Sequence, residues 1–553
     1  MKYLNSIALF LILFGLASCA KQSTPMGGPV DETPPKLLES SPLIESINTK
    51  PEKITLTFDE YVKLDNPSKG IIITPRINKD EVIFTAIKNS IVIELNQELE
   101  DSTTYVFDFQ KSVVDISEEN PAENLKLVFS TGSTIDSLQL SGKINFTFPD
   151  NKIDYKNVLV GIYPIGDTTD IFTAAPYYLS QVDTLGNFAI SNIKNGNYLA
   201  YAWRDENGSL KAEFKSEDYD FLTDTIELNQ NATDLLFNLS KADITPLRIL
   251  RTGNFGKNFD IILNKNPIEK DVKSIDQTIE YQYNTGDKRI RIYPKIAYPD
   301  SSQFHIKLQD SVGFSIDTLI WAKFPESERR PEKLTVSANS GKNFYQNLEI
   351  ELKFNKPIAR INTDSLYIHY DTASFIRIDE SMFYLKDSSS SDILKIQLTL
   401  PDSLTKDIFS LKAADSTFVD YEGEYNENEL LANYKKLKRE AYADEITGSI
   451  EGANLPLIVQ LIDSKSEIIK EQYLENSFNY SFQLIEPGNY KIRVIEDSNK
   501  NGRWDPSNFT KKINAERVFY FRNEETKDEI TVRAGWTLAD QNITASPKTG
   551  FEK

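Results

Sequence analysis

The chain has 553 residues, more than one hydrophobic core usually serves, so its length predicts several domains of roughly 100 residues each. Apolar residues make up 40% and aromatic residues 11% of the chain, a composition that excludes global disorder. The net charge of −20 excludes the basic surface that nucleic acid requires, so no nucleic-acid partner is expected. One cysteine and two histidines, His305 and His369, exclude internal disulfides and leave almost nothing for zinc sites or for Ser-His-Asp and Cys-His catalysis.

The N-terminus has the features of an exported, lipid-modified segment. Met1-Lys2 gives a positive start, and the apolar run over 7–17 is short for a bilayer span but has the length of a signal-peptide core. The run ends in Leu16, Ala17, Ser18 and Cys19, which resembles the bacterial lipobox. The resemblance implies a signal peptide over 1–18, cleavage before Cys19 and lipidation of that cysteine. The alternative is an ordinary secretory signal in which Cys19 is incidental.

Residues 19–36 predict a lipid-anchored flexible tether, because 20–36 hold four prolines and two adjacent glycines without apolar periodicity. Several acyl chains hold a protein at a membrane far more firmly than one chain does. Ala20 stands where many inner-membrane lipoproteins of Gram-negative bacteria carry aspartate, and the acidic cluster that marks surface export in some groups is absent. By this resemblance we expect an outer-membrane lipoprotein of the cell envelope, on the periplasmic face.

Beyond residue 36 the pattern predicts an all-β chain of antiparallel β-sandwiches. Apolar and polar residues alternate in short stretches, as over 54–58 and 91–95, with Asn, Asp, Gly and Pro between them. This is typical of half-buried strands in sandwiches. Residues 426–441 are the one segment that could form a helix, although an internal repeat makes part of it a strand.

The chain contains an internal repeat, whose copies lie about 300 positions apart. Residues 186–207 match 478–499, and residues 54–59 match 350–355, so the order of units is A-B-C-A-B. The matched positions include Gly142 with Gly448, Gly196-Asn197-Tyr198 with Gly488-Asn489-Tyr490, Asp205 and Asn207 with Asp497 and Asn499, and Val114-Asp115 with Val419-Asp420.

Each unit resembles a known kind of sandwich. Unit A resembles bacterial Ig-like domains of the surface-layer type, through Thr33-Pro34-Pro35-Lys36, the strand over 54–60 and the closing Phe129-Ser130-Thr131-Gly132. Unit B resembles transthyretin-like, carboxypeptidase-regulatory-like sandwiches, through its Gly-Lys-Ile first strand, residues 183–188 and its Gly-Asn-Tyr strand start. The implied domains, which are non-catalytic, are 37–135 (Ig-like), 136–243 (transthyretin-like), 244–330 (a β-rich module), 331–444 (second Ig-like) and 445–545 (second transthyretin-like).

The sharpest local motif is a candidate calcium loop. Asp497, Asn499, Asn501 and Asp505 stand at relative positions 1, 3, 5 and 9 with Gly502 at position 6, which is the spacing that a calcium loop needs. Position 12 is Asn508 instead of glutamate, and the first unit B diverges after Asn207, so a site would belong to the second copy alone. The alternative is a polar loop whose side chains cap backbone N–H groups. No cofactor is required, and a bound calcium would be structural.

No catalytic residue stands out. Carboxylate pairs such as Asp59-Glu60, Glu118-Glu119 and Asp218-Asp220 are expected among 82 acidic residues. Trp203, Trp321, Trp504 and Trp536 could stack on sugars or pack within cores and module junctions.

We therefore expect a membrane-anchored, non-enzymatic envelope lipoprotein that acts as a structural or interaction module. One alternative is an accessory lipoprotein that binds glycans or a protein complex, which an exposed aromatic patch would favour. Another is a hydrolase, which needs two carboxylates converging in one cleft.

Overall fold

A computed structural model describes residues 31–149, 153–387, 390–401, 403–523 and 528–551. Strands are the main secondary structure of these residues, with one four-residue helix, α2 (Pro67–Gly70), and short 3-10 turns. The predicted all-β fold of tandem sandwiches is confirmed. The predicted signal peptide, lipobox and Cys19 lie outside the described residues. Within the described ranges no helix has the length and apolarity to cross a bilayer.

The first module is a two-sheet sandwich over residues 37–131. Its sheets have the orders β1-β2-β6-β5 and β4-β7-β9, with a separate short pair β3-β8. Period-two alternation places Ile54, Leu56 and Phe58 of β2 between the sheets, where all three are fully buried. The strands are β1 (Leu37–Ser41), β2 (Lys53–Phe58), β3 (Val62–Leu64), β4 (Ile72–Thr74), β5 (Val82–Ile87), β6 (Ser90–Leu95), β7 (Thr104–Asp108), β8 (Val113–Asp115) and β9 (Lys126–Ser130).

The fourth module repeats this design. The sheet β25-β27-β32-β31 corresponds to β1-β2-β6-β5, and the pair β28-β34 corresponds to β3-β8. Its second sheet has the order β26-β35-β33-β29-β30. Residues 426–441 contain β35 and a 3-10 turn at Arg439–Ala441, so this segment forms a strand, as the internal repeat indicates, and not an α-helix. The strands are β25 (Val336–Ala338), β26 (Asn343–Phe344), β27 (Asn347–Phe354), β28 (Ile358–Ile361), β29 (Leu366–His369), β30 (Phe375–Arg377), β31 (Phe383–Asp387), β32 (Ser390–Thr399), β33 (Ile408–Ala413), β34 (Phe418–Asp420) and β35 (Leu430–Lys436).

The second and fifth modules share one topology. The pairings β12-β11-β14-β15 and β10-β13 of the second module recur as β38-β37-β40-β41 and β36-β39 in the fifth. The second-module strands are β10 (Leu138–Phe146), β11 (Val158–Pro164), β12 (Tyr178–Gln181), β13 (Asn187–Ile193), β14 (Gly196–Arg204), β15 (Asp218–Phe221), β16 (Ile226–Leu228) and β17 (Ala232–Lys241). Those of the fifth are β36 (Ala443–Glu451), β37 (Leu457–Asp463), β38 (Ile468–Leu474), β39 (Asn479–Ile485), β40 (Gly488–Glu496), β41 (Val518–Tyr520), β42 (Ile530–Val532), β43 (Thr537–Leu538) and β44 (Ile543–Thr544).

The repeated glycine of these two modules has a steric cause. A Cβ on Gly142 would collide with the backbone carbonyl of Leu235, and a Cβ on Gly448 would collide with that of Gln541. Each glycine lets the first strand lie close beside the chain that runs parallel to it.

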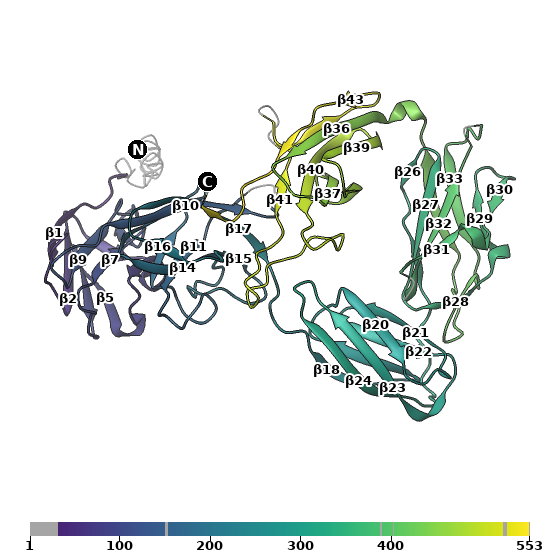
Figure 1. The fold of residues 1–553 in the computed structure, drawn as a ribbon, viewed down its shortest axis with the longest axis horizontal. Coiled ribbons are helices and arrows are strands. Elements are labelled where there is room, and N and C mark those ends of the chain that lie inside the picture. The colour runs from purple at the N-terminus through teal and green to yellow at the C-terminus, as the bar shows by residue number, and fades with distance from the viewer. Residues whose placement is uncertain (1–30, 150–152, 388–389, 402, 524–527, 552–553) are drawn as a thin grey trace, which may run out of the picture.

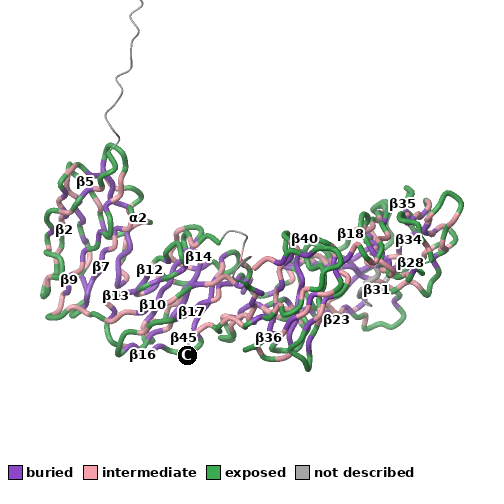
Figure 2. Tube along the Cα trace, turned by 90° about the horizontal axis from the view of Figure 1, so that it is seen from above, coloured by how far each residue is buried: buried purple, intermediate pink, exposed green. Residues whose placement is uncertain are grey.

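The third module lies over residues 249–324 and consists of two sheets, β18-β19-β22-β21 and β20-β23-β24, that enclose a separate core. Its strands are β18 (Ile249–Phe255), β19 (Asn258–Leu263), β20 (Glu269–Ser274), β21 (Tyr281–Gly286), β22 (Arg289–Pro294), β23 (Tyr298–Gln309) and β24 (Ser315–Phe324). Figure 2 shows buried residues running along the strands of every module, with exposed residues on the loops.

Modules two to five close into a ring (Figure 1). The final strand, β45 (Gly550–Phe551), pairs with β17 of the second module, so the C-terminus leaves the fifth module and joins another sheet. Three hydrogen bonds join the other neighbouring modules. Asn508 Nδ2 of the fifth module donates to Val312 O of the third (2.8 Å), and Asn258 Nδ2 of the third donates to Glu422 Oε1 of the fourth (2.9 Å). Asn343 Nδ2 of the fourth donates to Glu486 Oε2 of the fifth (2.7 Å). The first module docks on the second through Arg76, whose guanidinium binds Asp167 at 3.0 Å.

Candidate functional site

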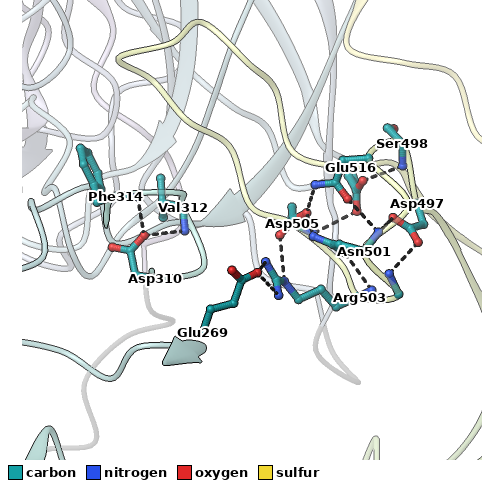
Figure 3. A network of polar contacts seen from close by, with 12 residues as sticks. Glu269, Asp310, Val312, Phe314, Asp497, Ser498, Asn501, Arg503, Asp505 and Glu516 are labelled. Carbon is teal, nitrogen blue, oxygen red and sulfur yellow. Dashed lines mark hydrogen bonds and ion pairs between the residues drawn. The ribbon is translucent and has the colours of Figure 1, made fainter. Parts of the chain in front are cut away.

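The predicted calcium motif lies in the acidic loop, residues 497–516, which connects β40 to β41 (Figure 3). Asp497 is fully buried, and its carboxylate accepts hydrogen bonds from the backbone N–H of Asn501 (3.0 Å) and of Gly502 (2.8 Å). Gly502 has φ 76°, the left-handed conformation that this sharp turn requires. Both amides, of Asn499 and Asn501, donate to the Asp505 carboxylate. The structure therefore brings together all four residues of the motif.

Glu516 completes the acidic loop, although no sequence motif predicts its role. Its two carboxylate oxygens accept from the backbone N–H of Ser498 (2.6 Å) and of Asp505 (3.0 Å), so Glu516 joins the two ends of the motif. Burial raises the pKa of Glu516 to about 7. The residue stands eleven positions after Asp505, beyond the twelve positions of the calcium-loop motif that begins at Asp497.

The second module builds the same arrangement in residues 205–217. Asp205 accepts from the backbone N–H of Ser209 (2.9 Å) and of Leu210 (2.8 Å), as Asp497 does at the same relative positions. Glu217 accepts from the backbone N–H of Glu206 (2.8 Å) and of Glu213 (2.9 Å), as Glu516 does in the fifth module. The first copy thus keeps the buried carboxylates even though its sequence diverges after Asn207.

The carboxylates of the acidic loop are engaged by the protein itself. Asp497 and Glu516 bind backbone N–H groups, and Asp505 also contacts the Arg503 Nε at 3.3 Å. Across the described ranges, no group of three or more His, Cys, Asp or Glu side chains is placed to hold a metal ion. These contacts are those of the polar-loop alternative, in which side chains cap backbone N–H groups. Calcium binding at the loop stays a prediction.

The acidic loop of the fifth module is longer than its counterpart, and the extra residues reach into the second module. Eleven positions separate Asp505 from Glu516, against four between Glu213 and Glu217. The additional segment carries Phe509, whose ring packs edge-on against Phe172 (4.9 Å) and Phe221 (5.4 Å). Lys512 lies over the Phe509 ring at 3.8 Å.

Phe509 enters a cluster to which four modules contribute, called here the junction cluster. Ile72 comes from the first module, Val312 and Phe314 from the third, and most of the remainder from the second. The Asp310 carboxylate positions the third-module residues by accepting from the backbone N–H of Val312 (3.0 Å) and of Phe314 (2.8 Å) (Figure 3). The second-module members include Tyr163, Phe172, Tyr201, Trp203, Tyr219 and Phe221.

A cavity of about 320 Å³ lies between the second and fifth modules, and Asp220, Glu496 and Glu516 line it. Asp220 is buried and accepts four hydrogen bonds, two of them from the fifth module's Asn514 Nδ2 (3.0 Å) and from Thr549 Oγ1 (2.6 Å). The other two donors are the backbone N–H groups of its own module. Burial raises the pKa of Asp220 to about 6.

Glu496 lies in the same cavity but is held in its charged form. Burial opposes that charge, and the Arg517 guanidinium, 2.8 Å from Glu496 Oε2, lowers the pKa below its ordinary value. The pKa of Glu496 is thus lowered whereas those of Asp220 and Glu516 are raised, and each of the three carboxylates has protein donors.

The four tryptophans differ in exposure. Trp203 is fully buried in the junction cluster, and Trp504 packs edge-on against Phe148 at 4.7 Å. Trp536 is partly exposed beside Arg533. Trp321 is 62% exposed on the outer face of the sheet β20-β23-β24.

The surroundings of Trp321 form a mixed apolar and polar face. Gln303 lies opposite Trp321 and His305 opposite Leu319 across β23 and β24. Leu319 and Ile275 are more than half exposed, and His305 Nε2 contacts Asp317 Oδ1 at 2.5 Å. This Trp321 face is an exposed aromatic patch with hydrogen-bonding groups beside it.

We expect the calcium prediction to be decided by thermal unfolding in calcium and in chelator. Calcium at 100 times its dissociation constant would stabilise the folded chain by about 2.7 kcal/mol. The unfolding temperature of wild type should then be higher in calcium than in chelator, whereas that of Asp505→Asn should be the same in both. Asp224→Asn, at an exposed position, should behave as wild type. An unchanged wild-type unfolding temperature would leave the acidic loop as a polar cap.

We expect Asp220 to make the stability depend on pH. The pKa of Asp220 is about 6 in the folded protein, against an ordinary value of 3.8. Between these two pH values the folded chain therefore binds a proton at Asp220 that the unfolded chain does not. Stability therefore rises as the pH falls through about 6, and wild type should gain about 2 kcal/mol relative to Asp220→Asn between about pH 7.5 and about pH 4.5. Denaturant unfolding of both proteins, with Asp224→Asn as control, measures this difference. Parallel pH profiles for wild type and Asp220→Asn would contradict it.

Comparisons with known proteins agree with the fold of the first module. A family described as a bacterial Ig-like domain matches residues 31–131. No curated protein matches the chain. Among solved structures, the chain is similar to a Bacteroides ovatus mixed-linkage glucan utilization locus protein, SGBP-B, in complex with a mixed-linkage heptasaccharide (12% identity, 71% of this chain, 93% of that chain, TM-score 0.15).

Two further solved structures are similar at lower identity. They are the Bacillus anthracis TIE protein (7% identity, 97% of this chain, 79% of that chain, TM-score 0.13) and the T6 backbone pilin of Streptococcus pyogenes (9% identity, 72% of this chain, 81% of that chain, TM-score 0.12). The chain therefore contains an Ig-like domain, matched by its family, within an array of β-sandwiches.

Proposed function

We propose that this protein is a non-enzymatic lipoprotein of the bacterial cell envelope. It is anchored in the outer membrane through lipidated Cys19, on the periplasmic face, and it acts as a structural or interaction module. The anchor is supported by the signal-like run over 7–17 and by the lipobox Leu16, Ala17 and Ser18 before the chain's single cysteine.

The observation that carries the structural role is the junction cluster. Side chains from four modules pack into it, and β45 returns the C-terminus to the second module. Modules joined only by linkers move freely relative to one another, whereas buried contacts of this kind fix their relative positions. The array holds its outward surfaces at fixed positions relative to one another.

A non-enzymatic role fits the state of the buried carboxylates. Asp497, Glu516, Asp205 and Glu217 accept hydrogen bonds from backbone N–H groups, and Glu496 pairs with Arg517. Groups engaged in this way stabilise loops. The hydrolase alternative has no support from these contacts.

The anchor is tested by labelled-palmitate incorporation and membrane fractionation of cells that express wild type or Cys19→Ala. Wild type should take up label and sediment with membranes, whereas Cys19→Ala should be unlabelled, because acylation needs the thiol. Protease treatment of intact cells identifies the face, and protection from the protease is expected. An unlabelled and soluble wild type would overturn the anchor.

The Trp321 face favours a second candidate function, which is glycan binding. An exposed indole ring can stack on the apolar face of a sugar. Gln303, His305 and Asp317 lie beside the ring and can hydrogen-bond to the hydroxyl groups of that sugar. This candidate concerns the ligand and is compatible with the lipid anchor.

Glycan binding is tested with arrays of envelope and plant polysaccharides probed with the mature chain. Trp321→Ala should lose about five- to tenfold in affinity if stacking contributes about 1–1.4 kcal/mol. Trp536→Ala serves as the matched control, since the Arg533 guanidinium lies over that ring at 5.1 Å, and it should bind as wild type. Equal binding by all three proteins would exclude the Trp321 face as the site.

A further inference from the structure

β24 of the third module is an edge strand with one unpaired side. It pairs with β23 alone, and at ten residues it is the longest edge strand of the described chain. Eight successive residue pairs join it to β23 without a register shift, from Gln309 opposite Ser315 to Ser302 opposite Ala322. Proline, bulges and inward-pointing charges, the features by which natural proteins prevent edge pairing, are all missing from this stretch of β24.

Every second residue of β24 directs its backbone N–H and C=O to the unpaired side. Gln303 of β23 uses its C=O on the other side, where it accepts from the Ile275 N–H at 2.9 Å. Trp321, which lies opposite Gln303, therefore directs its own backbone groups away from β23. Lys323 has the same phase, because its C=O accepts from Asn254 Nδ2 of β18 at 2.6 Å.

By this alternation the backbone groups of Asp317, Leu319 and Trp321 all point to the unpaired side. Among the described residues no backbone or side-chain group hydrogen-bonds to them there. The edge of β24 is therefore a row of free donors and acceptors with the spacing of a β-ladder.

The sequence of β24 is complementary to itself when a second copy of the strand lies antiparallel beside it. With Ile320 opposite Ile320 of the second copy, Leu319 lies opposite Trp321 and Asp317 opposite Lys323. Each apolar side chain thus meets an apolar one and each acid meets a base, which are the cross-strand pairs that stabilise sheets. The same register sets residues that point to the unpaired side against each other, as the ladder requires.

The pairing also covers an open flank of the third module's core. Ile316 and Ile320 face that core but are only partly buried. A strand beside β24 removes their remaining apolar surface from water, and Ile320 of the second copy adds to it.

We propose that two copies of this protein associate through β24, by a two-fold antiparallel pairing that joins their β20-β23-β24 sheets into one continuous sheet. A second copy is the occupant because one strand supplies both halves of every complementary pair. The inference goes beyond the proposed function and needs no lipid anchor. The second strand lies in the plane of the sheet, so the face that carries Gln303 and His305 stays open to the glycan of the second candidate function.

The test is disulfide formation between introduced cysteines in the unlipidated mature chain. Cys19→Ser removes the chain's only cysteine. In the proposed register the Cα atoms of the two Ile320 residues are about 4.5 Å apart, within the range of a disulfide. Leu319 lies diagonally from Leu319 of the second copy, at about 7–8 Å and outside that range. Leu319→Cys is the matched control, because position 319 is exposed and random collisions would favour it over position 320.

Under mild oxidation we expect Ile320→Cys to form a linked dimer at least about tenfold faster than Leu319→Cys. A mixture of Leu319→Cys and Trp321→Cys should also form the linked dimer, whereas neither protein alone should do so. These two positions are exposed, so the mixture decides the question even if Ile320→Cys is unfolded by circular dichroism. Equal rates at positions 319 and 320, a faster rate at 319, or no linked dimer in the mixture would overturn the proposal.

Sedimentation velocity of the chain without introduced cysteines measures the association itself. A pairing of one strand from each copy is small, so the dimer is expected at high protein concentration. Lys323→Asp sets two acids opposite each other and should raise the concentration needed for the dimer at least about tenfold. Lys288→Asp, an equal charge change at an exposed turn of the same module, should sediment as wild type.

A wild type that stays monomeric at every concentration, or equal weakening by Lys288→Asp, would contradict the pairing. These measurements contain neither membrane nor glycan, so their failure leaves the proposed anchor and the glycan candidate untouched.

Discussion

The arrangement of the modules depends on one partly buried side chain of the fifth module, Phe509, which packs against aromatic rings of the second module. Aromatic pairs of this kind contribute about 0.5–1.5 kcal/mol beyond the apolar area that they bury. Because the rings of Phe172 and Phe221 already belong to the second module, this contact ties the fifth module to it. Neighbouring Asn508 and Asn514 add hydrogen bonds to the third and second modules.

The acidic loop explains how a long surface loop can present Phe509 in one position. Asp497 and Glu516 bind the two ends of the loop through backbone N–H groups, so the seven additional residues are fixed at their base. In the second module the same carboxylates close a shorter loop, and its Asn207 carbonyl accepts a hydrogen bond from Lys69 Nζ of the first module at 3.1 Å. One capping device therefore closes the loop in both copies, and only the longer loop carries an aromatic side chain into the junction cluster.

Local sequence patterns predicted the fold well but did not predict the contacts between modules. The alternation of apolar and polar residues around Ile54 indicated a sandwich strand, because the side chains of a strand alternate between its two faces. The repeated Gly-Asn-Tyr segments indicated the duplication, because both copies keep the same residues at the same spacing. Glu516 was missed because an insertion moves it beyond any motif spacing. The pairing of β45 with β17 and the different exposures of Trp203 and Trp321 depend on how modules dock, which no local pattern contains.

The central claim is that modules two to five form one body and that the Phe509 contact contributes to holding the fifth module on the second. Small-angle X-ray scattering of the mature chain and of Phe509→Ala tests it most directly. The account predicts that wild type scatters as the closed ring of Figure 1 and that Phe509→Ala has a larger radius of gyration, because the fifth module separates from the second. Identical scattering from both proteins, or an extended wild type, would contradict it.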